Sequence, residues 1–268
     1  MCIRDSSDTG RRNKAWKVIE TWLVRESELA LLDRARLRHI LSELQFHNGD
    51  FKMAMANYHW RLKCGERWGG APSQPEWQGE PLDGKSILVF AEQGVGDQVL
   101  FMALLTDLQA TGARVVLESD PRLIPLFRRS FPHVTCVPVE NPPVPETLSS
   151  DLDYHVAMGS LGCWLWDKFS RRAHGPYLQA DNDKTTELRN KYKGENNVRL
   201  IGVSWKSPLG KFSEMKSLAL RDLMPLLQLP RTRFIDLQYG ETKAERQMLQ
   251  SDFGGEIMHD ASVDQMKA

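Results

Sequence analysis

The stretch of the sequence with the clearest potential for chemistry is EQGVGD, residues 92–97. It follows an apolar run at residues 86–90, which predicts a buried strand. It precedes residues 97–111, whose leucines recur every four residues as on a helix. Glycines in such a turn let the backbone approach a ligand, and ligands of parallel sheets bind at the carboxyl ends of strands. At that edge the carboxylate of Asp97 could take a proton from a hydroxyl group.

Two other interpretations of this turn are open. A dinucleotide-binding turn has the pattern G-x-G-x-x-G, but Val99 stands where the third glycine belongs. The acids after the next predicted strand, Glu118 and Asp120, lie among turn residues, so an NAD-dependent enzyme is disfavoured. Aspartate also caps helices and is stabilised at their positive ends, which gives Asp97 a purely structural explanation.

The first part of the chain, residues 11–68, is predicted to be helical. Apolar residues recur there at three- and four-residue spacing, and an Asn-Gly pair interrupts the pattern before Asp50, which can cap a second helix. The small residues Ser42 and Ala54, with Tyr58 four residues after Ala54, fit the tetratricopeptide pattern of small residues where paired helices approach closely. An ordinary helical hairpin would need similar residues, so both interpretations stay open.

The rest of the chain is predicted to form α/β structure. Residues 69–85 are rich in glycine and proline and are expected to be a linker whose tryptophan docks on a domain surface. Strands and helices alternate after it, which predicts parallel sheets of the Rossmann-like type. We expect an acceptor-type domain at residues 86–180 and part of a second, donor-type domain at residues 181–268.

Further local predictions concern the helices and the last strand of the second domain. Residues 183–193 and 219–227 are predicted to be helices, and EIMHD at residues 256–260 is predicted to be the last strand. Thr242 and Glu245 have the spacing of a capping box at the start of a helix.

Composition limits the classes of function. Lys and Arg number 35, as do Asp and Glu, and this zero net charge argues against a nucleic-acid binder. No apolar run is long enough for a membrane span, and no signal peptide is apparent. The four cysteines lie far apart with no CxxC pair, which favours reduced thiols in a cytoplasm, so we expect a cytoplasmic protein. Residues 1–10 are expected to be a remnant of cloning or read-through, outside the fold and without ordered structure. The four cysteines and seven histidines are scattered, which predicts no metal site.

The segment WQGEPLDGKSILVFAEQGVGDQVLF, followed by GARVVLESDPRLIPLF, closely resembles bacterial proteins that fuse tetratricopeptide repeats to a glycosyltransferase domain related to heptosyltransferases. The resemblance runs from about Asp50 to the end of the chain, and EQGVGD is its most diagnostic part. It implies a GT-B fold of two Rossmann-like domains. By position it implies that Asp97 is the general base of an inverting sugar transfer from a nucleotide-diphospho-sugar. It also implies that the acceptor side is lined by Glu92, Gln93, Gly94 and Gly96.

A second resemblance lies in IGVSWKSPLGKFSEMKSLAL and the later FIDLQYGET. In this family a basic loop after the first strand of the second domain contacts the donor diphosphate, and lysine suits a diphosphate as a mobile point charge. A solvated basic loop would place lysines here as well. The resemblance implies donor contacts from Ser204, Lys206, Lys216, Gln238 and Tyr239, with Ser207 and Lys211 in the same stretch.

The sequence therefore predicts a glycosyltransferase fragment that needs neither metal nor cofactor. Residues 85–268 are fewer than the roughly 300 that two such domains need, and the family's later glycine-rich donor motif does not follow. We expect the chain to bind a nucleotide-sugar weakly or not at all, and its helical segment to bind an acceptor glycan or protein. A non-catalytic interaction module built on the helical segment is the alternative from another class.

Overall fold

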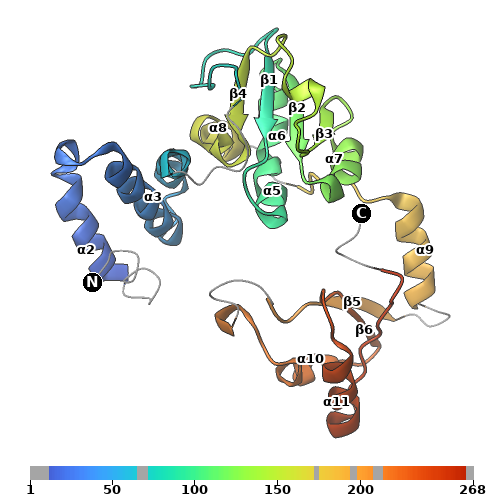
Figure 1. Cartoon of the computed structure of the whole chain (residues 1–268). Helices are drawn as coiled ribbons and strands as arrows, with labels where there is room; N and C mark the ends of the chain where they lie inside the picture. Colours follow the sequence, from blue (N-terminus) through green and yellow to red (C-terminus); the bar gives the residue numbers. More distant parts are fainter. Residues whose placement is uncertain (1–11, 65–71, 172–174, 194–197, 208–213, 264–268) are drawn as a thin grey trace. The chain divides into compact units, whose positions relative to one another are not determined.

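The chain forms two compact units, Met1–Gln179 and Ala180–Ala268 (Figure 1). Within them the computed structural model describes residues 12–64, 72–171, 175–193, 198–207 and 214–263. Residues 1–10, expected to be a remnant of cloning or read-through, and Lys211 of the expected donor loop lie outside the described residues.

The first unit begins with helices. These are α2 (Arg12–Leu23), η1 (Glu26–Glu28), α3 (Leu31–Asn48), α4 (Phe51–Tyr58) and η2 (His59–Cys64). Gly49 ends α3 with a left-handed φ of 79°, and the side chain of Asp50 caps α4 by accepting a hydrogen bond from the Met53 amide at 3.4 Å. The predicted hairpin, its turn and its cap are confirmed. α2 and α3 bury a small core of Ala15, Ile19, Leu37, Leu41 and Leu44.

A four-stranded parallel sheet follows. Its strands are β1 (Ser86–Phe90), β2 (Arg114–Ser119), β3 (Thr135–Pro138) and β4 (Tyr154–Ala157), in the order β3-β2-β1-β4. All three pairings are parallel, which confirms the predicted α/β class and its parallel sheet. The order changes direction between β1 and β4, and ligands of open α/β sheets commonly bind where the strand order changes direction.

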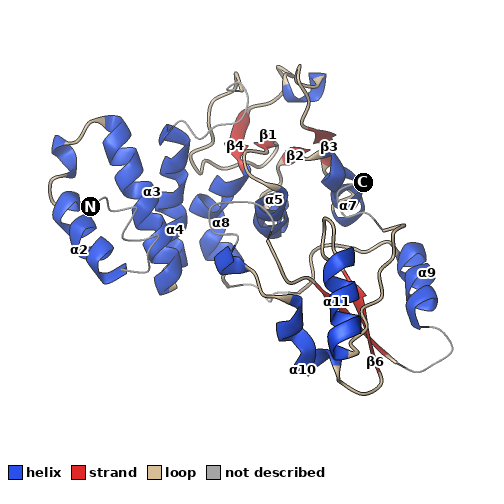
Figure 2. Cartoon of the chain, turned by 60° about the horizontal axis from the view of Figure 1, so that its bottom comes forward, coloured by secondary structure: helices blue, strands red, loops and turns tan. Residues whose placement is uncertain are grey.

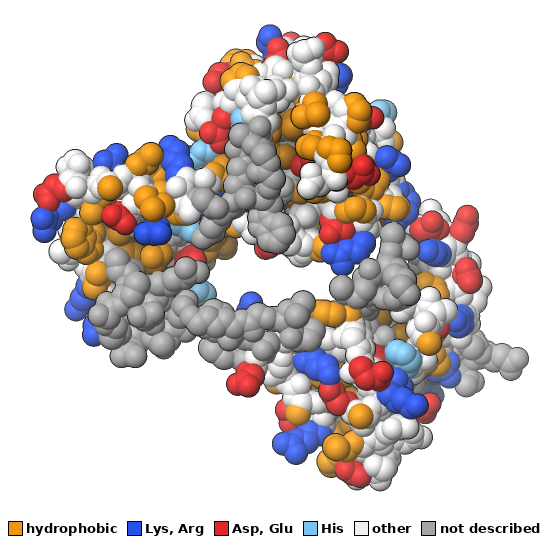
Figure 3. All heavy atoms as spheres, viewed as in Figure 1, with side chains coloured by type: hydrophobic (Ala, Val, Ile, Leu, Met, Phe, Trp, Pro, Cys, Tyr) orange, Lys and Arg blue, Asp and Glu red, His pale blue; other side chains and the backbone are white. Residues whose placement is uncertain are grey.

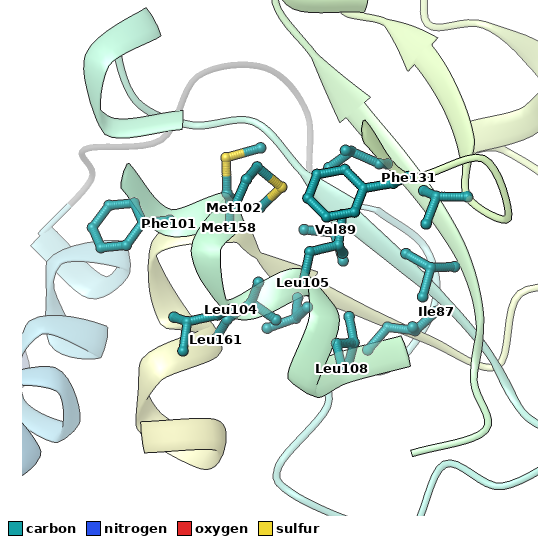
Figure 4. Packing of buried hydrophobic residues seen from close by; sticks show 14 of the residues in the cluster. Ile87, Val89, Phe101, Met102, Leu104, Leu105, Leu108, Phe131, Met158 and Leu161 are labelled. Carbon is teal, nitrogen blue, oxygen red and sulfur yellow. The ribbon is translucent and has the colours of Figure 1, made fainter. Parts of the chain in front are cut away.

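The two faces of the sheet bury different residues, because successive side chains of a strand point to opposite faces. On one face lie α5 (Val95–Phe101), η3 (Met102–Leu104), α6 (Leu105–Gln109), η4 (Pro121–Leu123), α7 (Ile124–Ser130), η6 (Met158–Ser160) and α8 (Leu161–Phe169). α5, α7 and α8 are seen along that face in Figure 2. Ile87 and Val89 of β1 pack there against Leu105, Phe131 and other residues of this core (Figure 4). Leu88 and Phe90 pack on the opposite face.

The predicted helix at residues 97–111 differs in detail. It begins at Val95 and consists of α5, a 3₁₀ turn and α6 rather than one continuous helix. A 3₁₀ turn advances fewer residues per turn than an α-helix, so residues before and after it do not share one face. Leu104 and Leu108 are buried in the core, whereas Leu100, before the 3₁₀ turn, is 65% exposed. The four-residue spacing predicted that all three leucines lie on one buried face of a helix, and for Leu100 this prediction is wrong.

Part of the predicted linker packs on the outer edge of the sheet. The backbone of His155 in β4 receives a hydrogen bond from the Trp77 amide at 2.8 Å and donates one to the Pro75 carbonyl at 3.0 Å. Trp77 is buried, with its indole nitrogen donating to the Glu80 carbonyl at 2.9 Å. The expected docking of this tryptophan is confirmed, and these contacts cover the edge of β4.

The second unit is smaller. It consists of α9 (Asn182–Lys193), β5 (Arg199–Val203), η7 (Glu214–Lys216), η8 (Leu220–Leu223), α10 (Met224–Leu227), β6 (Thr232–Asp236) and α11 (Lys243–Phe253). β5 and β6 pair in parallel. The expected last strand is reduced to one parallel bridge between Met258 and Ile235. The predicted helix at residues 219–227 is a 3₁₀ turn followed by α10.

The predicted capping box at α11 is wrong. Thr242 donates its hydroxyl hydrogen to Asp236 at 2.6 Å instead of capping the helix. Glu245 accepts a hydrogen bond from the indole of Trp205 at 2.6 Å and pairs with Lys206. Both side chains are engaged by partners from other elements, which a local spacing rule does not include.

No helix in the described ranges is long and apolar enough to cross a bilayer. On the face seen in Figure 3, basic and acidic side chains are interspersed.

Candidate functional site

The EQGVGD turn lies at the carboxyl end of β1, as predicted. Gly94 is the residue that precedes α5, and Asp97 lies in the first turn of that helix and is exposed. Neither glycine has a positive φ. A β-carbon at Gly96 would meet open space, and one at Gly94 would make only an ordinary contact with the Asp97 carboxylate at 3.7 Å. The chain's own packing therefore does not require glycine at either position.

The Asp97 carboxylate has no hydrogen bond or ion pair within the described part of the chain. A capping aspartate would accept a hydrogen bond from a backbone amide at the helix start. The capping explanation therefore does not match this geometry, although the positive end of α5 still favours a negative charge there. What remains is an exposed, unpaired carboxylate at the carboxyl edge of the sheet.

Glu92, predicted to line the acceptor side, is instead buried and paired. Its carboxylate forms two hydrogen bonds with the guanidinium of Arg61, one of them from Nε at 3.0 Å, and it accepts the Gly159 amide at 3.0 Å. Neither side chain of the pair is exposed. Gln93 is half-buried and donates to the Tyr58 hydroxyl at 3.1 Å.

Gln98 connects the turn to the neighbouring strand. Its amide nitrogen donates to the Gln93 carbonyl at 2.9 Å, and its amide oxygen accepts from the Ser119 hydroxyl at 2.7 Å and the Asp120 backbone amide at 2.9 Å. Gln98 and Arg61 were not predicted as site residues. Neither has a signal in a single sequence, because their partners are distant along the chain.

Near the turn, Ser160, His59 and Glu76 have the composition of a hydrolase triad. The Ser160 hydroxyl lies 3.1 Å from His59 Nδ1, and His59 Nε2 lies 3.7 Å from Glu76. Ser160 is fully buried and accepts a hydrogen bond from Arg61 at 3.2 Å. Burial lowers the pKa of His59. A substrate has no access to this serine, so the array is structural.

Glu118 is a further carboxyl group at this edge of the sheet. Burial raises the pKa of Glu118 above its ordinary value, and a hydrogen bond from the Ala91 backbone amide opposes that rise. The stability associated with a raised carboxyl pKa is present below the unfolded value near 4.5 and is lost as pH rises through the folded value.

Glu118→Gln is therefore expected to stabilise the protein more at pH 8 than at pH 5. Glutamine keeps an oxygen that can accept from Ala91 but has no charge to desolvate. The measurement is the difference in thermal midpoint between variant and wild type at the two pH values. The exposed Glu140 provides a control through Glu140→Gln, expected to change neither midpoint appreciably. A gain for Glu118→Gln that is equal at both pH values would contradict the raised pKa.

In the second unit, Gln238 organises the predicted donor loop. Its side-chain oxygen accepts hydrogen bonds from the Ser204 hydroxyl at 3.0 Å, the Trp205 amide at 3.0 Å and the Lys206 amide at 2.9 Å. The structure therefore brings Ser204, Lys206 and Gln238 together at the carboxyl ends of β5 and β6. Tyr239 is half-buried beside Gln238.

A cavity of about 430 Å³ adjoins this loop. Polar and charged groups of Lys206, Ser207 and Ser217 line it beside apolar side chains that include Met248 and Phe253. The Lys206 ammonium pairs with Glu245, and the Ser207 amide donates to the Ser217 hydroxyl at 3.0 Å. Lys216 is exposed in η7 and is not among the residues that line this cavity.

Among the described side chains, no three His, Cys, Asp or Glu residues gather in a group that could hold a metal ion.

The described chain is thus an α/β protein with a parallel four-stranded sheet and a helical first segment. No family model matches it. Over 205 residues it is 27% identical to "Protein FlbA" of Caulobacter vibrioides, a match that covers 70% of this chain and 34% of FlbA. The chain spans about a third of the length of that relative.

Proposed function

We propose that the chain is part of an inverting glycosyltransferase in which Asp97 is the general base. The observation that carries the proposal is the Asp97 carboxylate itself, exposed in the first turn of α5 and unpaired among the described residues. A base must be accessible and free to accept a proton. The two glycines before it, which the chain's own packing does not require, leave room for an acceptor.

The reaction follows from the roles of these groups. Asp97 takes the proton of an acceptor hydroxyl while the hydroxyl oxygen forms a bond to the anomeric carbon of the donor sugar. The bond from that carbon to the diphosphate oxygen breaks, and the electron pair leaves with the nucleoside diphosphate. Attack opposite the leaving group inverts the anomeric configuration. Negative charge that develops on the diphosphate favours nearby cationic groups, a role we assign to Lys206.

The donor side is supported by the loop around Gln238. Three hydrogen bonds to one amide oxygen hold Ser204, Trp205 and Lys206 in a fixed arrangement, and preorganised groups stabilise charge better than mobile ones. The adjoining cavity of about 430 Å³ lies in the size range of small-molecule sites, roughly 300–1,000 Å³. One lysine, one arginine and two serines line it beside apolar side chains, which suits a ligand that has both a phosphate and a ring, although the carboxylates of Glu214 and Glu245 line it as well.

On the acceptor side, we assign the lining to Gln93, Gly94 and Gly96, because Glu92 is buried against Arg61. The helical segment precedes this site in the same compact unit, and we propose that it contributes to binding a glycan or protein acceptor.

A titration with nucleoside diphosphates, followed by nuclear magnetic resonance, tests the donor site. We expect UDP, GDP or ADP at millimolar concentration to shift the backbone resonances of residues 204–207, 217 and 238–239. Lys206→Ala should weaken the binding, and Lys193→Ala, which changes another lysine of the same unit, should not. Shifts confined to other residues, or shifts at residues 204–207 that Lys206→Ala leaves unchanged, would count against the donor assignment. The non-catalytic interaction module would then be favoured.

A further inference from the structure

The carboxyl ends of β1 and β4, where the strand order changes direction, are joined by a side chain from the helical segment. Arg61 lies in η2 and is fully buried. Its guanidinium donates to Glu92, which follows β1, and to the Ser160 hydroxyl at 3.2 Å, which follows β4. One side chain thus links both strand ends.

Further contacts fix the orientation of this guanidinium. Nη1 also donates to the Tyr58 carbonyl at 3.0 Å, and the group lies over the Tyr58 ring at 4.2 Å from its centre. The guanidinium is planar and is held by a two-point hydrogen bond to the carboxylate of Glu92, by two single hydrogen bonds and by an aromatic ring. These contacts together allow it one orientation, whereas the ammonium of a lysine would stay mobile.

The partner of Arg61 is the first residue of the glycine turn. Glu92 accepts from Arg61 and from the Gly159 amide at 3.0 Å, and Gln93 donates to it at 3.2 Å. A β-carbon at Gly159 would lie 2.7 Å from the Arg61 guanidinium and 2.8 Å from the Glu92 carboxylate. The chain approaches this pair so closely that a larger residue at Gly159 would displace it.

We propose that Arg61 is a positioning residue, which reaches from the helical segment to hold the EQGVGD turn, and that this segment is an integral part of the site. Arg61 is too deeply buried to contact an acceptor, so it acts through Glu92. The inference rests on the proposed function only in assigning a catalytic role to the EQGVGD turn. That Arg61 connects the helical segment to this turn follows from the contacts alone.

The alternative is that the pair merely contributes to packing. A buried ion pair can often be replaced by uncharged side chains of similar volume without loss of stability, whereas removal of one partner leaves an uncompensated charge. The double variant Arg61→Met with Glu92→Gln therefore separates positioning from stability. We expect its thermal midpoint to stay within about 4 °C of the wild type.

Hydrogen exchange in the full chain is the test. In the double variant we expect amide exchange in residues 91–104 to be about tenfold faster than in the wild type, because the turn loses the hydrogen bonds that hold it. Where transfer activity can be measured, the turnover number should fall with little change in the KM for donor.

The matched control is a second ion pair of the same residue types. Arg38 pairs with Glu26 through two hydrogen bonds and also donates to Asn57 at 3.2 Å, and all three residues lie in the helical segment, outside the turn. Arg38→Met with Glu26→Gln should leave exchange of residues 91–104 within about twofold of the wild type. Unchanged exchange in the Arg61 and Glu92 variant, or an equal rise in the control, would overturn the proposal. A lack of transfer activity in the wild type would bear on the proposed function alone, because the exchange result does not depend on it.

Discussion

Asp97→Asn is expected to lower the rate of sugar transfer by about two to four orders of magnitude while leaving the fold intact. Asparagine has nearly the same size and caps helices about as well as aspartate, but its amide cannot accept the acceptor's proton. Because Asp97 is exposed and has no hydrogen bond to lose within the described ranges, we expect the thermal midpoint to move by no more than about 2 °C. Turnover and thermal midpoint should be measured on one preparation of a transfer-competent form of the protein.

The control for this experiment is an aspartate that does cap a helix. Asp50 accepts a hydrogen bond from the Met53 amide at the start of α4, and Asp50→Asn should keep full turnover. Near-native turnover of Asp97→Asn would return Asp97 to a structural role and remove the main support for the enzyme. Equal losses in both variants would point to a general effect on folding instead.

Arg61→Met alone is expected to lower the free energy of unfolding of the first unit by about 3–5 kcal/mol. The substitution leaves the Glu92 carboxylate buried without its cationic partner, and the remaining hydrogen bonds from Gly159 and Gln93 do not neutralise its charge. Seven of the eight tryptophans lie in the first unit, so urea unfolding followed by tryptophan fluorescence reports mainly on it.

Arg38→Met is the comparison for this loss of stability. The side chains of Arg38 and Glu26 are 30% and 17% exposed, whereas those of Arg61 and Glu92 are not exposed at all, so water partly compensates for a lost partner and a smaller loss than for Arg61→Met is expected. If Arg61→Met and Arg38→Met lowered the free energy of unfolding by similar amounts, burial of the Arg61–Glu92 pair would not make its loss more destabilising.

Local sequence patterns predicted the parts of the structure that local physics determines. The apolar run at residues 86–90 and the glycine turn after it correctly placed Asp97 in the first turn of a helix at the edge of a parallel sheet. The Asn-Gly pair and Asp50 correctly placed the helical hairpin. In these cases the residues that decide the structure are close together along the chain.

The predictions that failed, and the contacts that were missed, depend on distant partners. Thr242 and Glu245 have the spacing of a capping box but bind Asp236, Trp205 and Lys206 instead. The spacing rule considers one helix, and tertiary hydrogen bonds overrode it. In the same way, nothing in EQGVGD reveals that Glu92 is paired with an arginine from the preceding helical segment. The roles proposed for Asp97 and the donor loop stay predictions.

The link between Arg61 and two separate strand ends has a consequence for biosynthesis. The ribosome releases Arg61 before Glu92, and Gly159 and Ser160 follow much later, after β4. Until then the guanidinium of the nascent chain has no complete set of partners. The core between α2 and α3 can form earlier, because none of its residues comes from the sheet. N-terminal domains usually fold first during translation, but here the contacts that join Arg61 to both strand ends can be completed only after residue 160 has been synthesised.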